Sequence, residues 1–116
     1  MKIERFGFGF IEIDGVSYPH DVVIDRGGVS KRRKKPSKPL RDRYGHTPLT
    51  LKESIPWDCR RLVVGTGAHG ALPVVEGIAD EASRRRVELL VVPTREAIAA
   101  LSEDAEDTNA ILHVTC

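Results

Sequence analysis

The first 25 residues alternate apolar with small or polar side chains, which predicts paired β-strands. Three phenylalanines alternate with glycines over Phe6–Phe10, and Asp14-Gly15 follows them. An Asp-Gly pair between apolar runs is a strong hairpin signal, because both central residues of a type I′ turn take positive φ. We therefore expect an antiparallel pair over about residues 7–13 and 16–24. Pro19 restricts part of the second strand to an edge or a bulge.

The second half of the chain alternates buried-strand runs with helical patterns. Apolar runs at 62–64, 87–92 and 110–114 predict three strands. Apolar spacing of 3.6 residues predicts an amphipathic helix over 73–86, and a shorter helix is expected over 94–101. Short connections in the order β-α-β-α-β place the helices against a sheet in which the first two of these strands are parallel.

Length and composition favour one soluble α/β domain spanning residues 1–116. The chain has 116 residues and contains no run of about 18 apolar residues that would span a membrane. The beginning of the sequence lacks the long apolar stretch of a signal peptide. The two cysteines, Cys59 and Cys116, do not resemble a disulfide framework. We therefore expect a reducing, cytoplasmic location.

Charge is distributed unevenly along the chain. Residues 1–57 carry 12 basic and 7 acidic side chains, whereas residues 58–116 carry 6 basic and 10 acidic ones. The segment around 30–45 contains Pro36, Pro39 and few apolar residues, so we expect an exposed excursion. Its eight basic residues are Lys31, Arg32, Arg33, Lys34, Lys35, Lys38, Arg41 and Arg43.

This basic run has two functional interpretations. It resembles a nucleic-acid contact, in which phosphates would make binding strongly salt-dependent. However, Tyr44 is the only aromatic residue close by, and stacking on bases normally needs more than one aromatic side chain. Docking to an acidic protein surface is at least as well supported, and the acidic residues 103–107 of a second copy are one such surface. An exposed loop without a partner is the simpler alternative.

The glycine-rich turn at 65–70 predicts a location for a site. Its Gly-x-Gly-x-x-Gly spacing matches the dinucleotide fingerprint after a strand and before a helix. Two features depart from that fingerprint: the helical pattern starts only near Pro73, and no acidic residue follows the strand at 87–92. A broader interpretation is that the main-chain amides of the turn bind an anionic group. The alternative is a tight turn without a ligand.

Four side chains near this end of the predicted sheet have chemistry worth weighing. Thr94 should lie beside the glycine turn, although a threonine at a helix start is usually a cap. His69 is a general acid or base in principle, and an exposed loop histidine is the simpler expectation. Cys116 would need a base such as His113 to become a nucleophile, but strand alternation places the two side chains on opposite faces. No pair of residues has convincing metal-ligand spacing, so neither a metal nor another cofactor is expected.

Three blocks of this sequence together resemble the adipogenesis-associated Mth-type domain family, the Mth938-like domain. The blocks are Leu-Val-Val-Gly-Thr-Gly-Ala-His-Gly-Ala-Leu at 62–72, Val-Glu-Leu-Leu-Val-Val-Pro-Thr-Arg-Glu-Ala-Ile at 87–98 and Ala-Ile-Leu-His-Val-Thr-Cys at 110–116. The resemblance implies a three-layer α/β domain with a central mixed sheet. Residues at matching motif positions are Gly65, Thr66, Gly67, Gly70, Pro93, Thr94, His113 and Cys116. With His69, they outline a candidate ligand pocket without assigned roles.

The resemblance implies little chemistry, because no enzymatic activity is settled for the family. Its mitochondrial relatives include a respiratory complex I assembly factor. We therefore expect a non-catalytic assembly or accessory factor that acts through protein partners. The alternatives are a small enzyme or sensor that holds an anion at Gly65–Gly70 and Thr94, and a nucleic-acid-binding protein that uses Lys31–Arg43.

Overall fold

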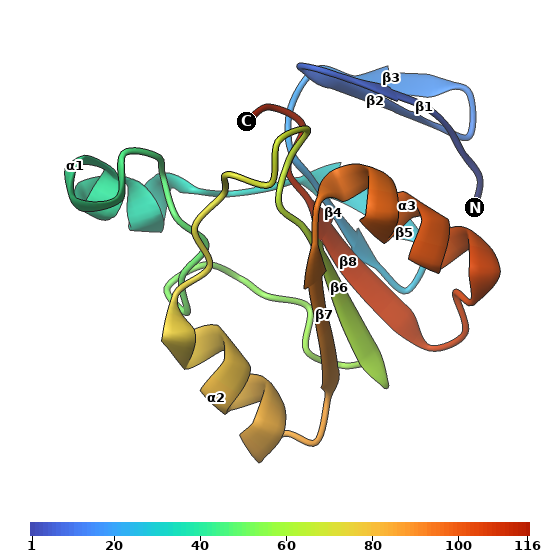
Figure 1. Ribbon diagram of the computed structural model, residues 1–116. Coiled ribbons are helices and arrows are strands. Elements are labelled where there is room, and N and C mark those ends of the chain that lie inside the picture. Colours follow the sequence, from blue (N-terminus) through green and yellow to red (C-terminus); the bar gives the residue numbers. More distant parts are fainter.

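The computed structural model describes residues 1–116, and its first three strands form a small antiparallel sheet (Figure 1). These strands are β1 (Ile3–Gly7), β2 (Phe10–Ile13) and β3 (Val16–Tyr18). The predicted Asp14-Gly15 turn joins β2 to β3, and its residues have φ values of 49° and 79°. The expected hairpin is thus confirmed, but the sheet gains β1 as a third strand.

The larger sheet has five strands in the order β5-β4-β8-β6-β7. Its strands are β4 (Val22–Asp25), β5 (Gly28–Lys31), β6 (Arg61–Gly65), β7 (Glu88–Val92) and β8 (Thr108–Leu112). The predicted parallel pairing of β6 with β7 is confirmed, and β6 is also parallel to β8. Strand β4 is antiparallel to both β8 and β5, so the sheet is mixed.

Two strand predictions need correction. The strand expected over 16–24 is two strands in different sheets, because the chain leaves β3 at Tyr18 and re-enters as β4 after Pro19. Proline has no amide hydrogen to donate, which suits this break between sheets. The strand around Leu90, expected to be buried, is instead the half-exposed edge of the sheet.

Both predicted helices form with changed bounds: the first is shorter than expected, and the second is two residues longer. Helix α2 (Glu76–Arg84) begins three residues after Pro73, because Val74 pairs with Leu49 in an isolated bridge. Helix α3 spans Thr94–Glu103. The remaining helical elements lie in the basic segment, which also contributes part of β5. They are a 3₁₀ helix, η1 (Lys35–Leu40), and α1 (Arg41–Tyr44).

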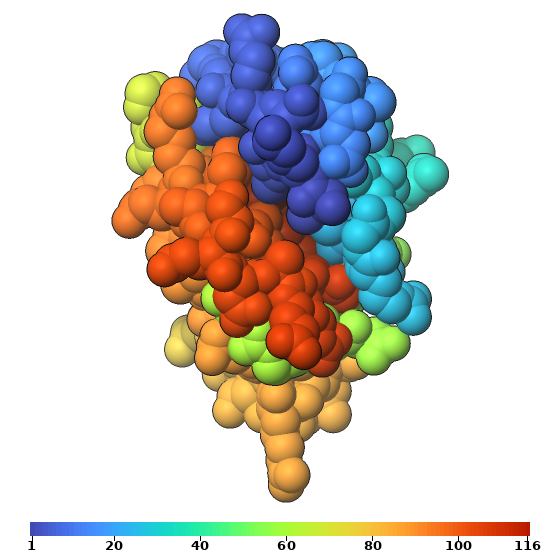
Figure 2. All heavy atoms as spheres, turned by 90° about the vertical axis from the view of Figure 1, so that its right-hand side faces the viewer, coloured from blue at the N-terminus to red at the C-terminus, as the bar shows by residue number.

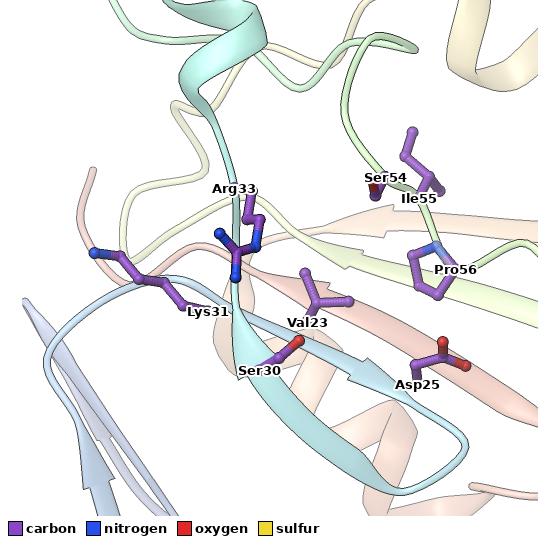
Figure 3. A pocket seen from close by; sticks show the side chains of 8 residues that line it. All are labelled: Val23, Asp25, Ser30, Lys31, Arg33, Ser54, Ile55 and Pro56. Carbon is purple, nitrogen blue, oxygen red and sulfur yellow. The ribbon is translucent and has the colours of Figure 1, made fainter.

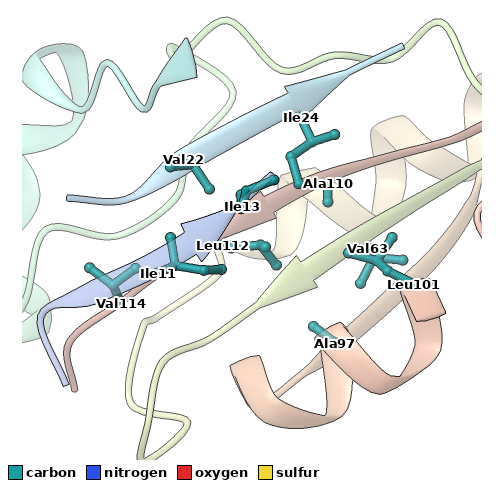
Figure 4. Packing of buried hydrophobic residues seen from close by; sticks show 10 residues of the cluster. All are labelled: Ile11, Ile13, Val22, Ile24, Val63, Ala97, Leu101, Ala110, Leu112 and Val114. Carbon is teal, nitrogen blue, oxygen red and sulfur yellow. The ribbon is translucent and has the colours of Figure 1, made fainter. Parts of the chain in front are cut away.

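Apolar side chains from both faces of the five-stranded sheet form two cores, which makes the domain three-layered as expected. On one face, α3 and the small sheet cover strands β4, β6 and β8. Figure 4 shows this core, with Ile11 and Ile13 of β2 pointing toward side chains of the larger sheet. Figure 2 shows the N-terminal strands lying against α3 on the surface of the molecule. On the other face, Ile78 and Ala82 of α2 pack against β6 and β8.

A substitution at Gly67 tests how tightly the turn after β6 is packed. Gly67 has a φ of +106°, and a β-carbon there would lie 2.7 Å from the main-chain oxygen of Thr115. We expect Gly67→Ala to lower the free energy of unfolding by about 3 kcal/mol through backbone strain and overpacking. Gly9 has a similar φ of +90° with open space around it, so Gly9→Ala isolates the backbone strain at about 1 to 2 kcal/mol. Equal losses in urea unfolding would contradict the packing argument.

Candidate functional site

The glycine turn is occupied by the chain's own C-terminal segment. The amides of Ala68 and His69 donate to the main-chain oxygens of Thr115 and Cys116, at 2.7 and 2.9 Å, and Ala71 also donates to Cys116. All seven amides from Thr66 to Leu72 donate to oxygens within the protein. The sequence suggested that these amides bind an anionic group, but their hydrogen bonds within the protein leave none of them free to do so. Helix α2 also starts too far along the chain to place its first turn at the glycines.

Thr94 lies beside the glycine turn, as the sequence indicated, but it does not cap α3. Its hydroxyl accepts a hydrogen bond from the Gly67 amide at 2.8 Å and donates to the His113 carbonyl at 2.7 Å. The side chain is fully buried. The cap position belongs to Pro93, and α3 has no side-chain cap. Thr94 therefore joins the loops after β6 and β8 and has no group left for a ligand.

The second feature near the end of β8 is a buried ion-pair network around Arg32. The guanidinium donates from Nε and Nη2 to both carboxylate oxygens of Glu53 at 2.8 Å, from Nη1 to Asp21 at 3.0 Å and from Nη2 to the Pro48 carbonyl at 2.9 Å. Ser37 adds a 2.6 Å hydrogen bond to Glu53. Only 2% of the Arg32 side chain is exposed. The expectation that Arg32 belongs to an exposed basic surface is therefore wrong.

Burial and pairing act in opposite directions on this network. Burial alone would lower the pKa of Arg32, but hydrogen bonds and charge interactions with Glu53 and Asp21 outweigh it and raise that pKa. Burial alone would likewise raise the pKa of Asp21. Hydrogen bonds from His113, the Val114 amide and Arg32, together with the charge interaction with His113, hold that pKa below its usual range. Both side chains therefore stay charged and paired inside the protein.

His113 connects this network to the C-terminal segment. Its Nδ1 lies 2.9 Å from Oδ2 of Asp21, and its Nε2 lies 3.1 Å from the Thr115 hydroxyl. An acid, an imidazole and a hydroxyl in this order resemble a catalytic triad. However, Asp21 is not dedicated to the histidine, because its Oδ2 also accepts a hydrogen bond from Arg32 and its Oδ1 accepts one from the Val114 amide. The arrangement therefore favours a positioning role for the histidine.

The other basic residues of the segment form an exposed surface. We call the exposed cations Lys31, Arg33, Lys34, Lys35, Lys38, Arg41 and Arg43 the basic surface. None of the seven forms an ion pair within the chain. The acidic residues 103–107 differ, because Asp104 pairs with Arg60 at 2.9 Å. Positive charge is thus concentrated on one part of the molecule without internal compensation.

A cavity of about 340 Å³ joins the basic surface to the end of β8. Its walls are Arg32, Lys34, Lys38, Arg41, Gly45, His46, Thr47, His113, Thr115 and Cys116. The structure therefore brings together His113 and Cys116 with four of the predicted basic residues. Gly65, Thr66, Gly67, Gly70 and Thr94 are outside the lining, and His69 is exposed on its loop.

Several residues of this cavity and of the network beneath it were not predicted. His46, Thr47 and Thr115 line the cavity, while Asp21 and Glu53 support it from below. One available signal was Asp21, an acidic residue placed directly before an apolar strand. The partners of Arg32 lie 11 and 21 residues away in sequence, so no local pattern identifies them.

A second cavity, of about 280 Å³, lies between the β4–β5 hairpin and the loop at 54–56 (Figure 3). Figure 3 shows Lys31 and Arg33 on one side of it and Asp25 on the other. Because charges of both signs line this cavity, it has less attraction for an anion than the cavity beside Cys116.

The thiols and the potential metal ligands of the chain add little to this site. Cys59 and Cys116 are both free thiols, and burial raises the pKa of Cys59, which makes its thiolate less available. Cys116, expected to be buried, is half-exposed. No group of three or more His, Cys, Asp or Glu side chains is arranged to hold a metal ion. None of the helices has the length and apolar character to cross a membrane.

The fold and this site define a three-layer α/β domain whose glycine turn is closed by its own C-terminal segment. Over its full length the chain is 31% identical to the conserved hypothetical protein PH1505 from Pyrococcus horikoshii OT3, with 100% of both chains covered and a TM-score of 0.82. It is 27% identical to MT938 with a TM-score of 0.71, covering 99% of this chain and 98% of that one. The chain belongs to the Mth938-like domain family, which confirms the resemblance seen in the sequence.

A more distant structure agrees in fold. A protein from Bordetella pertussis, described as a Mth938-like domain, is 17% identical with a TM-score of 0.58, and the match covers 97% of this chain and 85% of that one. A comparison with protein-family models finds no match, and a comparison with curated proteins also finds none.

Substitutions at Thr94 test its role as a bridge between the loops. Thr94→Val preserves the shape but leaves the Gly67 amide and the His113 carbonyl buried without this partner. We expect a loss of about 2 to 4 kcal/mol in the free energy of unfolding. Thr94→Ser keeps the hydroxyl and should lose about 1 kcal/mol for the missing methyl group. Similar losses for both variants in urea unfolding would show that the hydrogen bonds contribute little.

The pH dependence of stability tests Asp21. Because its pKa in the folded protein lies below the ordinary value of 3.8, ionised Asp21 stabilises the fold above that pH. This contribution is lost as the pH falls through the folded-state pKa, at about 1.4 kcal/mol for each unit of the shift. Asp21→Asn should lose about 3 kcal/mol or more at pH 7 and show a flatter decline below pH 4.

Chemical unfolding at several pH values between 2.5 and 7 measures both effects. Asp42 is an exposed carboxylate without an ion pair, so Asp42→Asn is the matched control and should follow the wild-type curve. A curve for Asp21→Asn parallel to that of the wild type would contradict the assignment.

Proposed function

We propose that this protein is a non-catalytic accessory or assembly factor that binds an acidic segment of a protein partner through its basic surface. The observation that carries the proposal is the set of seven exposed cations, none of which has an ion-pair partner in the chain. Uncompensated charge of one sign accelerates association with an oppositely charged surface and disfavours other partners.

The framework beneath the basic surface supports this role. The cations lie on β5, on the two residues before η1, on η1 and on α1, and Arg32 joins this segment to Asp21 and Glu53. Ser37 of η1 is fully buried and hydrogen-bonded to the same Glu53. A segment held in place loses less conformational entropy on binding than a mobile loop, so more of the electrostatic attraction appears as affinity.

The engagement of the polar groups supports a binding role rather than a catalytic one. The amides of the glycine turn hold the C-terminal segment, and Thr94 holds the loops after β6 and β8. His113 shares the oxygen of Asp21 with Arg32. We place this function in the reducing cytoplasm, where Cys59 and Cys116 would remain thiols.

Affinity capture with matched charge variants tests the proposal. The triple variant Lys34→Gln, Lys38→Gln, Arg41→Gln removes three cations from the basic surface. The control Lys2→Gln, Lys52→Gln, Arg86→Gln removes three exposed cations elsewhere. We expect the wild type and the control to retain an acidic partner that the triple variant loses, with capture by the wild type weakening as salt rises.

Three outcomes of this experiment contradict the proposal in different ways. Equal capture by both triple variants would show that the basic surface is not the contact. Retention of nucleic acid that is lost in the basic-surface variant, without an acidic protein, would favour the nucleic-acid alternative. Recovery of the chain itself as the partner, through its residues 103–107, would indicate a homo-oligomer instead.

A further inference from the structure

In the cavity beside Cys116, cationic side chains meet neutral hydrogen-bond donors from separate segments of the chain. Lys34, Lys38 and Arg41 come from the basic segment, Thr47 from the loop after α1, and Thr115 from the extension of β8. Lysine, arginine and hydroxyl groups are the side chains that commonly bind tetrahedral oxyanions. Convergence from three parts of the chain distinguishes this cavity from a simple run of lysines.

The acidic residues near the cavity do not cancel the positive charge of its lining. None of the lining side chains is a carboxylate. Asp21 and Glu53 lie just beneath, and Arg32, which is hydrogen-bonded to both of them, offsets one of their two negative charges inside the protein. Asp42, the one acid within the basic segment, does not line the cavity. An anion that enters therefore meets cationic side chains, and no acidic side chain competes with it in the lining.

The size and the lining of the cavity indicate what kind of ligand it fits. The cavity has about 340 Å³ of space, near the small end of the range for ligand sites. Almost all of its lining residues are polar or charged, which favours a compact, highly charged ligand.

We propose that this cavity binds a phosphomonoester group. A phosphomonoester carries close to two negative charges at neutral pH and three acceptor oxygens, which suits three cationic side chains and nearby hydroxyl groups better than a single carboxylate does. The inference rests on the proposed function, because the cavity that would bind the phosphate lies within the same basic surface. The phosphate would be carried either by a phosphorylated residue of the acidic partner or by a free small molecule.

Two double variants with equal charge changes test the site. Lys38→Gln with Arg41→Gln removes two cations that line the cavity. Lys35→Gln with Arg43→Gln removes two cations of the same segment that lie outside it. All four side chains are exposed, so both variants should fold, and circular dichroism with thermal unfolding checks this.

Titration calorimetry with inorganic phosphate, O-phosphoserine and a phosphoserine peptide supplies the readout, and the unphosphorylated peptide serves as a control. We expect wild-type binding of phosphate and phosphoserine, an affinity at least about tenfold weaker in the cavity variant, and a change of no more than about threefold in the outer variant. Tighter binding of the phosphopeptide than of phosphate would identify a partner-borne group, whereas equal affinities would identify a free one.

Two results would overturn the inference. One is the absence of phosphate and phosphoserine binding by the wild type. The other is an equal loss in both double variants, which would indicate diffuse charge attraction without a site. Either result leaves the proposed function standing if an acidic partner is still lost in the triple variant. If phosphate binds but no partner is captured, the inference about the cavity stands and the proposed function fails.

Discussion

The buried guanidinium of Arg32 is the interaction on which the proposed binding surface depends. It directly follows β5 and contacts Asp21 before β4, Glu53 in the connection to β6, and the Pro48 carbonyl. A buried charge of this kind is tolerated only when its partners surround it, and loss of one partner leaves the others uncompensated. The network thus fixes the course of the basic segment and offsets one of the two acidic charges beneath it. The position of the exposed cations and the pairing of the buried acids therefore both depend on one side chain.

The C-terminal segment after β8 is held from two sides. One of these sides is the glycine turn, which explains why this turn resembles a ligand site but has no free amide. On one side, Asp21 accepts hydrogen bonds from His113 and from the Val114 amide. On the other side, the glycine turn donates to the oxygens of Thr115 and Cys116. Main-chain oxygens take the place that an anionic ligand occupies in nucleotide-binding turns. The glycines allow the close approach, and this packing accounts for their spacing without a cofactor.

Local features of the sequence predicted the parts of the fold that local physics determines. The Asp14-Gly15 turn requires positive φ at both residues, so its type follows from two adjacent residues. The strand β6 and its parallel partner β7 were recognised from short apolar runs bounded by turn residues. Strand β1 was missed because its exposure does not alternate regularly, and its pairing with β2 is irregular between Ile3 and Arg5.

The site was harder to predict because its contacts connect distant parts of the chain. Arg32 stands within a run of similar basic residues, and only its contacts with Asp21 and Glu53 distinguish it. Thr94 has the position of a helix cap, yet its partners are an amide and a carbonyl 27 and 19 residues away. The predicted set therefore contained residues that the structure brings to one cavity, His113, Cys116 and the neighbouring cations, together with a glycine turn whose amides are engaged by the C-terminal segment.

The central place of β8 has a consequence for how the domain folds. This strand is the last of the eight in sequence, yet it lies between β4 and β6, and Val22 pairs with Leu112 across most of the chain. The β4–β5 hairpin and the β6–α2–β7 unit can form from local contacts, whereas the sheet that joins them requires β8. Pairing of such distant segments slows folding, because a long loop must close before the contact is made. Until β8 inserts, β4 and β6 expose unpaired edges, and a newly made chain is at this stage most prone to associate with other chains.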